Sequence, residues 1–241
     1  MVDPMLTVGF TEVRESRAVS VEEMKLIEDM ANSIGISRMV MMENAGGSIA
    51  RFIFQNHGEL REKSQDKVHV LLVAGTGNNG GDCFVVARHL AYWKNVFEIS
   101  IVIIGKPEDI KAPEARENYE ILKKNNSLTL IHVSSQETMN SFSSRLSSAN
   151  IVVAGIFGTG FKGEPRTLQR EVIELINENS ESIKLSVDVP SGLEAQTGKS
   201  VTAVRSDYTI TMHAPKVGML NNDAAKKLCG RILIANIGIP Q

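Results

Sequence analysis

The sequence has 241 residues, 42% of them apolar and 22% charged, and its 26 basic and 28 acidic residues leave a net charge of −2. These fractions are typical of globular proteins, and a chain of this length buries enough surface to fold without covalent staples. The near-neutral charge predicts no nucleic-acid partner, since nucleic-acid binding needs a basic face or tail. The two cysteines, Cys83 and Cys229, are too few and too far apart for a disulfide framework or a metal motif.

The N-terminal stretch to Arg17 carries Asp3, Glu12 and Glu15 and has no long apolar run, so it resembles neither a signal peptide nor a transit peptide. No apolar run approaches the roughly 20 residues of a membrane span. We therefore expect a cytoplasmic protein with no membrane partner.

The first quarter of the chain is predicted to be a pair of helices. Ser20 and Glu23 have the spacing of a capping box, in which each side chain satisfies the other residue's backbone N–H. This box opens a helix over residues 20–33, and a second helical pattern follows over residues 38–54.

From residue 68 onwards, apolar runs of strand length alternate with helical patterns. Strands are expected at residues 68–74, 99–104, 128–133, 151–154, 185–188, 208–212 and 232–235. Helices are expected at residues 82–93, 113–124, 136–146, 168–177 and 222–228. Such alternation builds a parallel sheet with right-handed crossovers. The prediction is one α/β domain over residues 1–241, with a Rossmann-like doubly wound, mostly parallel sheet after an N-terminal helical pair.

The first predicted loop with chemistry, Gly75 to Asp82, contains the G-x-G-x-x-G pattern of dinucleotide sites between a strand and a helix. Its glycines let the backbone approach a phosphate, and the helix N-terminus is partially positive. A dehydrogenase would also place an acid at the end of the next strand to hold the ribose, but Glu98 stands before that strand. Asn78, Asn79 and Asp82 therefore indicate a polar nucleotide site of another kind. The alternative is a tight turn capped by Asp82.

Two further loops follow predicted strands. Gly158 to Glu164 is again rich in glycine, and Asp188 stands at the end of a buried strand before a Pro-Ser-Gly turn. A carboxylate in that place is typical of the catalytic acids and bases of α/β enzymes, although it can also serve only as a turn cap. In a sheet of strand order 3-2-1-4-5, all three loops open onto one crevice.

Other polar residues have two interpretations each. Lys216 either approaches a phosphate or is solvated, and Cys83 is either a reactive thiol or a small buried filler. Glu43 and Asn44 lie in an apolar helix and need partners, so they either contact the crevice or brace another loop. The spacing of the remaining candidates suggests no metal site: His57, His69, His89 and His132.

These motifs together resemble the NAD(P)HX epimerases, also called the YjeF N-terminal-domain family. The resemblance runs from about Arg17 to Pro240. It rests on five motifs: Met42-Glu43-Asn44-Ala45-Gly46, Gly77-Asn78-Asn79-Gly80-Gly81-Asp82, Phe157-Gly158-Thr159-Gly160, Val187-Asp188-Val189-Pro190-Ser191-Gly192 and Ala214-Pro215-Lys216. The first loop paired with Asp-Val-Pro-Ser-Gly is the specific combination.

The resemblance implies an isomerase of cofactor repair. NAD(P)HX is NADH or NADPH hydrated at the nicotinamide C6, with R and S epimers that the family equilibrates. A separate ATP- or ADP-dependent dehydratase, which accepts only S, then restores the cofactor. Asp188 is the implied catalytic carboxylate. The implied substrate-binding residues are Asn78, Asn79, Gly80, Gly81, Asp82, Gly158, Thr159, Gly160, Phe161, Lys162, Gly163, Glu164 and Asp188.

The resemblance also implies a potassium ion near Asn79 and Ser191. The family usually has an acidic residue four positions before the glycine that corresponds to Gly158, and this chain has Ala154 there. We therefore expect potassium to bind weakly, because the carboxylate that would offset its charge is missing.

Two other functions compete with epimerisation. Related domains in RNA-decay assemblies are non-catalytic scaffolds, but the acids and amides of the loops are present here and the charge is near neutral. An ordinary NAD-dependent dehydrogenase is the other alternative. A homodimer and functional coupling to a dehydratase are the expected associations.

Overall fold

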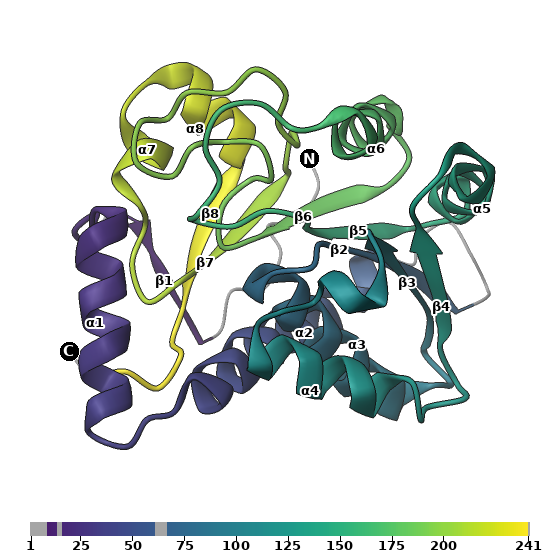
Figure 1. The fold of residues 1–241 in the computed structure, drawn as a ribbon, viewed down its shortest axis with the longest axis horizontal. Helices are drawn as coiled ribbons and strands as arrows, with labels where there is room; N and C mark the ends of the chain where they lie inside the picture. Colours follow the sequence, from purple (N-terminus) through teal and green to yellow (C-terminus); the bar gives the residue numbers. More distant parts are fainter. Residues whose placement is uncertain (1–8, 14–15, 61–66, 241) are drawn as a thin grey trace.

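The computed structural model describes residues 9–13, 16–60 and 67–240, so Asp3 and Glu15 lie outside the described residues. One sheet extends through it in the strand order β1-β8-β7-β6-β5-β2-β3-β4 (Figure 1). Its strands are β1 (Phe10–Glu12), β2 (Val68–Ala74), β3 (Phe97–Ile104), β4 (Thr129–Val133), β5 (Ile151–Gly155), β6 (Ile183–Val187), β7 (Tyr208–Met212) and β8 (Arg231–Ala235). All neighbouring strands are parallel except β1 and β8.

The predicted strand order is confirmed. Strands 3-2-1-4-5 of the prediction are β4-β3-β2-β5-β6, so the winding reverses between β2 and β5. The short edge strand β1 was not predicted. Three residues give too little periodicity to be recognised in a sequence.

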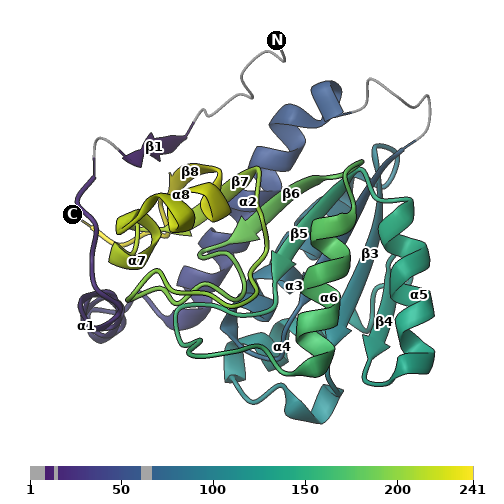
Figure 2. The ribbon, with the colours of Figure 1, turned by 90° about the horizontal axis from the view of Figure 1, so that it is seen from above.

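Helices cover both faces of the sheet (Figure 2). They are α1 (Val21–Ser33), α2 (Arg38–Leu60), α3 (Asn78–Leu90), α4 (Pro113–Leu122), α5 (Gln136–Ser147), α6 (Thr167–Glu178), α7 (Val217–Leu220) and α8 (Asp223–Cys229). Helices α2, α3 and α4 pack in one apolar cluster with Val70 and Leu72 of β2. Helices α5 and α6 pack in another with Leu71 and Val73. Because β2 is buried on both faces, it reads as a continuous apolar run.

The capping box of α1 is confirmed. The Ser20 hydroxyl accepts a hydrogen bond from the Glu23 N–H at 3.0 Å, and the Glu23 carboxylate accepts one from the Ser20 N–H at 2.7 Å. Helix α2 extends to Leu60, beyond the predicted end at residue 54. None of the described helices combines the length and apolarity that crossing a membrane requires.

The predicted start of α3 at residue 82 is wrong. The helix begins at Asn78, so Asn78 to Asp82 form its first turns rather than a loop. Glycine is usually unfavourable inside a helix, but here Gly80 and Gly81 allow neighbouring segments to pack closely. A Cβ on Gly80 would overlap the carbonyl oxygen of Gly75, and one on Gly81 would lie 2.6 Å from the Met42 methyl.

Candidate active site

The carboxyl ends of β2, β5 and β6 surround two adjoining hollows. The larger, about 740 Å³, lies between the start of α3 and the segment after β5. Its lining consists of Gly75, Thr76, Gly77, Asn78, Asn79, Ile104, Ile156, Phe157, Gly158, Thr159, Gly160, Phe161, Lys162, Glu164, Arg166 and Gln169. The first two predicted loops therefore meet, as expected from the strand order.

The smaller hollow, about 120 Å³, adds the third predicted loop. It is lined by Glu28, Arg38, Met41, Met42, Ala45, Asn78, Asn79, Asp82, Glu114, Thr159, Asp188, Met212 and Ile237. Asn78, Asn79 and Thr159 line both hollows. A ligand that fills the larger hollow can therefore extend into the smaller one, where Asp188 lies.

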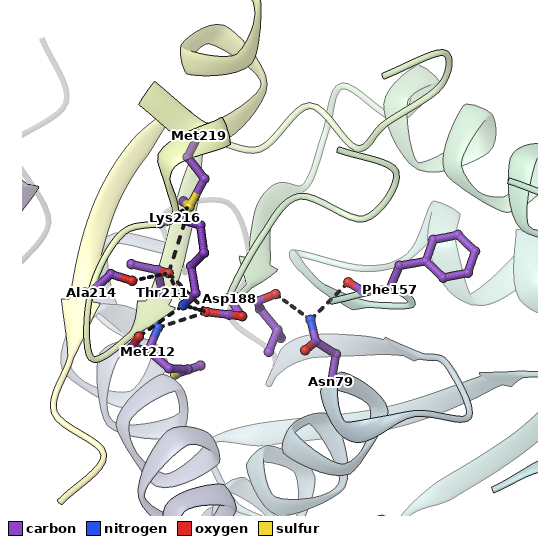
Figure 3. Close-up of polar contacts among 9 residues, drawn as sticks. Asn79, Phe157, Asp188, Thr211, Met212, Ala214, Lys216 and Met219 are labelled. Carbon is purple, nitrogen blue, oxygen red and sulfur yellow. Dashed lines mark hydrogen bonds and ion pairs between the residues drawn. The ribbon is translucent and has the colours of Figure 1, made fainter. Parts of the chain in front are cut away.

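Asn79 ties the ends of β5 and β6 together (Figure 3). Its amide nitrogen donates to the carbonyl of Phe157 at 3.0 Å and to that of Val187 at 2.8 Å. A Cβ on Gly158 would overlap the Asn79 side chain, so only glycine fits beside this amide. Asn79 thus fixes the distance between the second and third loops.

Asp188 follows β6 with a backbone φ of +63°. The Val189 N–H donates to the Val187 carbonyl at 2.7 Å across Asp188, which makes a γ-turn of the strained, positive-φ kind. Few residues other than glycine tolerate this conformation, and aspartate is one of them. Stored backbone strain of this type is concentrated at functional sites.

The side chain of Asp188 is held through one oxygen (Figure 3). Its Oδ1 accepts hydrogen bonds from the Thr211 hydroxyl and the Met212 N–H, both at 3.1 Å, and from the Lys216 ammonium. Among the described residues none donates to Oδ2. The carboxylate is therefore fixed in place while one oxygen stays available to a ligand.

The structure supports neither interpretation of Lys216, because the residue is shielded from solvent and lines neither hollow. The residue is 1% exposed, and its ammonium also donates to the Thr211 hydroxyl and the Met212 carbonyl, each at 3.1 Å. It forms a buried ion pair with Asp188. A buried ammonium is stable only when paired and hydrogen-bonded in this way.

Three more carboxyl groups line the smaller hollow, those of Asp82, Glu28 and Glu114. Asp82 of α3 is 8% exposed. Burial, then the charges of Asp188 and Glu28, raise the pKa of Asp82 well above its usual range, and Lys216 opposes them. Burial and the charge of Asp188 also raise the pKa of Glu28, against the effects of Lys216 and Arg38. Glu28 comes from α1 and was not predicted.

A family model described as "YjeF-related protein N-terminus" matches residues 38–218. The chain belongs to this family. The NAD(P)H-hydrate epimerases of Cenarchaeum symbiosum and Nitrosopumilus maritimus are 37% and 34% identical to it, each over 92% of this chain and 95% of their own length. The bifunctional NAD(P)H-hydrate repair enzyme Nnr of Hyperthermus butylicus is 35% identical over 93% of this chain, which spans 39% of that protein.

The fold is shared with a solved structure, that of yeast ynu0. The TM-score is 0.73 at 23% sequence identity, and the match covers 85% of this chain and 84% of the yeast chain. Glu28 lies outside the matched part of the YjeF family model, and Arg38 stands at its first residue.

Three of the residues predicted to bind substrate, Gly80, Gly81 and Gly163, line neither hollow. Gly80 and Gly81 pack within α3, as described above, and Gly163 turns the chain with a φ of +78° while its N–H donates to Glu194 at 2.9 Å. Glu164 lines the larger hollow and pairs with Arg170 at 3.0 Å. Two residues that line this hollow, Arg166 and Gln169, were missed because they belong to the helix start after the glycine-rich segment.

The remaining candidates are structural. Glu43 pairs with Arg88 and His89 of α3. Burial raises the pKa of Glu43, but the His89 hydrogen bond and the Arg88 charge together bring it below its usual value. Asn44 donates to the Ile237 carbonyl at 2.9 Å. Both thus brace neighbouring segments.

Cys83 is fully buried, and burial raises the pKa of its thiol, which supports the filler role over the reactive one. In the described part of the chain, no group of three or more histidine, cysteine, aspartate or glutamate side chains has the arrangement of a metal site.

The residues expected to hold potassium do not form a fitting cation cage. The Ser191 hydroxyl accepts hydrogen bonds from the N–H groups of Ile156 and Phe157, both at 3.1 Å, and donates to the Phe157 carbonyl at 3.3 Å. The Asn79 amide nitrogen, not its oxygen, faces the nearby carbonyls. Ala154 is fully buried in the apolar cluster under α5 and α6. Hard cations need converging oxygen ligands, and here hydrogen bonds already engage these oxygens.

Proposed function

We propose that this YjeF-family protein interconverts the R and S epimers of hydrated NADH and NADPH as part of nicotinamide cofactor repair. The observation that carries the proposal is the free Oδ2 of Asp188, fixed in the smaller hollow, which adjoins a hollow large enough for a nucleotide. The names of the relatives that match over nearly their whole length agree with it.

The larger hollow suits the nucleotide part of the substrate. The N-cap of α3, Gly77, makes no side-chain capping bond, so the first N–H groups of the helix remain free to bind a phosphate. Lys162 and Arg166 add positive charge to the same lining. The nicotinamide ring then reaches past Asn79 into the smaller hollow.

The smaller hollow suits the chemistry at C6. This carbon carries a hydroxyl next to the ring nitrogen, so its configuration inverts by reversible loss of the hydroxyl or by opening of the ring. Either route needs a positioned group that moves a proton, in a site that excludes competing reactions. Asp188 is that group. Lys216, Thr211 and the Met212 N–H hold it through Oδ1, so Oδ2 stays available to the substrate.

The competing functions explain less. A dehydrogenase would use an acid at the end of the second parallel strand for the ribose, and β3 ends at Ile104, followed by Gly105 and Lys106. A non-catalytic scaffold would have no use for a strained, buried carboxylate with its own ammonium partner.

Two relatives named bifunctional repair enzymes contain a region similar to this chain within a longer protein. This supports coupling to a dehydratase. A homodimer stays a prediction.

The direct test is to follow purified S-NADHX and S-NADPHX by NMR with and without the protein. We expect the R and S forms to equilibrate faster in its presence, with no consumption of ATP or of a reducing equivalent. Interconversion at the buffer rate across a pH series, with the protein folded by circular dichroism, would contradict the proposed function.

We also propose that potassium contributes little. Epimerisation should persist when tetramethylammonium replaces potassium, because Ser191 and Asn79 already satisfy the nearby oxygens. Thermal unfolding with each cation reports binding directly, and Ala154→Asp should add a potassium-dependent rise in melting temperature. Strict dependence in the unaltered protein would mean instead that the Asn79 amide turns its oxygen towards an ion, with Asp82 supplying the missing charge.

A further inference from the structure

The smaller hollow holds a buried carboxyl group, Asp82, for which the proposed chemistry has no role so far. The side chain is 8% exposed and lines the hollow together with Asp188. No described residue donates a hydrogen bond to it. An ionised carboxylate in such a place keeps little of its hydration and gains no donor from the described residues in return, so the neutral acid is favoured.

The neighbouring charges act in the same direction. Asp188 at the end of β6 and Glu28 of α1 both oppose ionisation of Asp82, and Lys216 opposes them with a smaller effect. Lys216 is in direct contact with Asp188 and therefore offsets the charge of that carboxylate. The charge of Glu28 has no such contact with Lys216.

Two more charged groups line the hollow from other elements. Arg38 of α2 divides its guanidinium between Glu28, at 3.8 Å, and Asp29, and Glu114 of α4 adds another acid. The hollow therefore contains two carboxyl groups in contrasting surroundings: Asp188 in an ion pair and Asp82 among acids. Two carboxyls with diverging environments are the usual basis for an acid and a base in one site.

We propose that Asp82 is the proton donor of this site, a neutral carboxylic acid kept in that form by burial and by Glu28 and Asp188, and that Asp188 is the base that works with it. This inference rests on the epimerase function proposed above. It gives Glu28, which the sequence did not reveal, the part of a positioning residue that acts through Asp82.

The pair balances the ring-opening route without a co-reactant. Asp82 gives its proton to the ring nitrogen as the bond from that nitrogen to C6 breaks, and the bond's electron pair stays on nitrogen. The C6 hydroxyl gives its proton to Oδ2 of Asp188 and becomes an aldehyde. After the aldehyde rotates, the reverse transfers close the ring on the other face, and both carboxyls regain their original states.

The pH profile of kcat/KM tests this assignment. Activity that needs neutral Asp82 falls as the pH rises through its raised pKa. Glu28→Gln removes one opposing charge, so this alkaline fall should move to lower pH, whereas Glu22→Gln, an exposed change on the same helix, should leave it in place. Asp82→Asn should lower kcat by about 10²–10⁴-fold, since the amide donates a hydrogen bond but no acidic proton.

Infrared difference spectra of unaltered protein against Asp82→Asn read the protonation state without any substrate. We expect the carbonyl band of a protonated carboxylic acid at neutral pH, lost at lower pH values in Glu28→Gln than in Glu22→Gln. An ionised Asp82 at neutral pH, or an alkaline limb that Glu28→Gln leaves unmoved, would overturn the inference. Failure of the epimerase function alone would appear as absent turnover with this band still present.

Discussion

Asp188→Asn should reduce epimerisation by about 10²–10⁴-fold, the usual contribution of a positioned acid–base group. Asparagine has nearly the same size and also tolerates the positive φ of +63° at this position, so the γ-turn should persist. What it loses is the ability to accept a proton at Oδ2. The measurement is the rate of exchange between the S and R forms by NMR, with nucleotide binding followed separately by calorimetry.

Stability must be separated from chemistry in this variant. Asparagine leaves the buried Lys216 ammonium without its counter-charge, and breaking one side of a buried pair costs about 3–5 kcal/mol. The matched control is Asp188→Asn with Lys216→Met, which removes both charges together and should recover much of that loss. If the double variant is stable, binds nucleotide and is still inactive, the carboxylate carries the chemistry. Near-normal turnover in either variant would reduce Asp188 to a turn residue.

The strand pattern alone predicted how the three loops meet. Apolar runs such as residues 68–74 are unambiguous because strands buried on both faces leave no polar alternation, and the strand order then determines which loops adjoin. Asp188 was identifiable for the same reason, since it directly follows such a run and precedes a rigid turn. The start of α3 could not be predicted, because its glycines allow close packing that only the folded chain reveals.

The charges inside the site were harder to predict. A lysine in sequence is most often solvated, and nothing local to Lys216 shows that β6 and β7 bring it against Asp188. Glu28 lies 160 residues from Asp188 on a helix whose capping box is its strongest local signal. The γ-turn at Asp188 likewise depends on the strand β7 beside it, since the Asp188 N–H donates to the Ile210 carbonyl at 2.8 Å.

Lys216→Met should destabilise the protein by about 3–5 kcal/mol, because it leaves the Asp188 carboxylate buried with only the Thr211 hydroxyl and the Met212 N–H as donors. For a chain of this size, that corresponds to a fall in melting temperature of roughly 6–20 °C. Methionine matches the length and apolar stem of lysine, so packing changes little. Thermal unfolding followed by circular dichroism gives the value.

The same variant also tests whether Lys216 positions the base or only stabilises the fold. Without the ammonium, only two donors hold Oδ1 of Asp188, so kcat should fall even for the protein that remains folded, while nucleotide binding by calorimetry persists. A residue with a purely structural role would lower activity only in proportion to the unfolded fraction. A double-mutant cycle of Lys216→Met with Asp188→Asn measures the coupling, which residues in direct contact show as non-additive effects. Additive effects on stability would mean that the two side chains act independently, and the site would then need another source for the fixed orientation of Asp188.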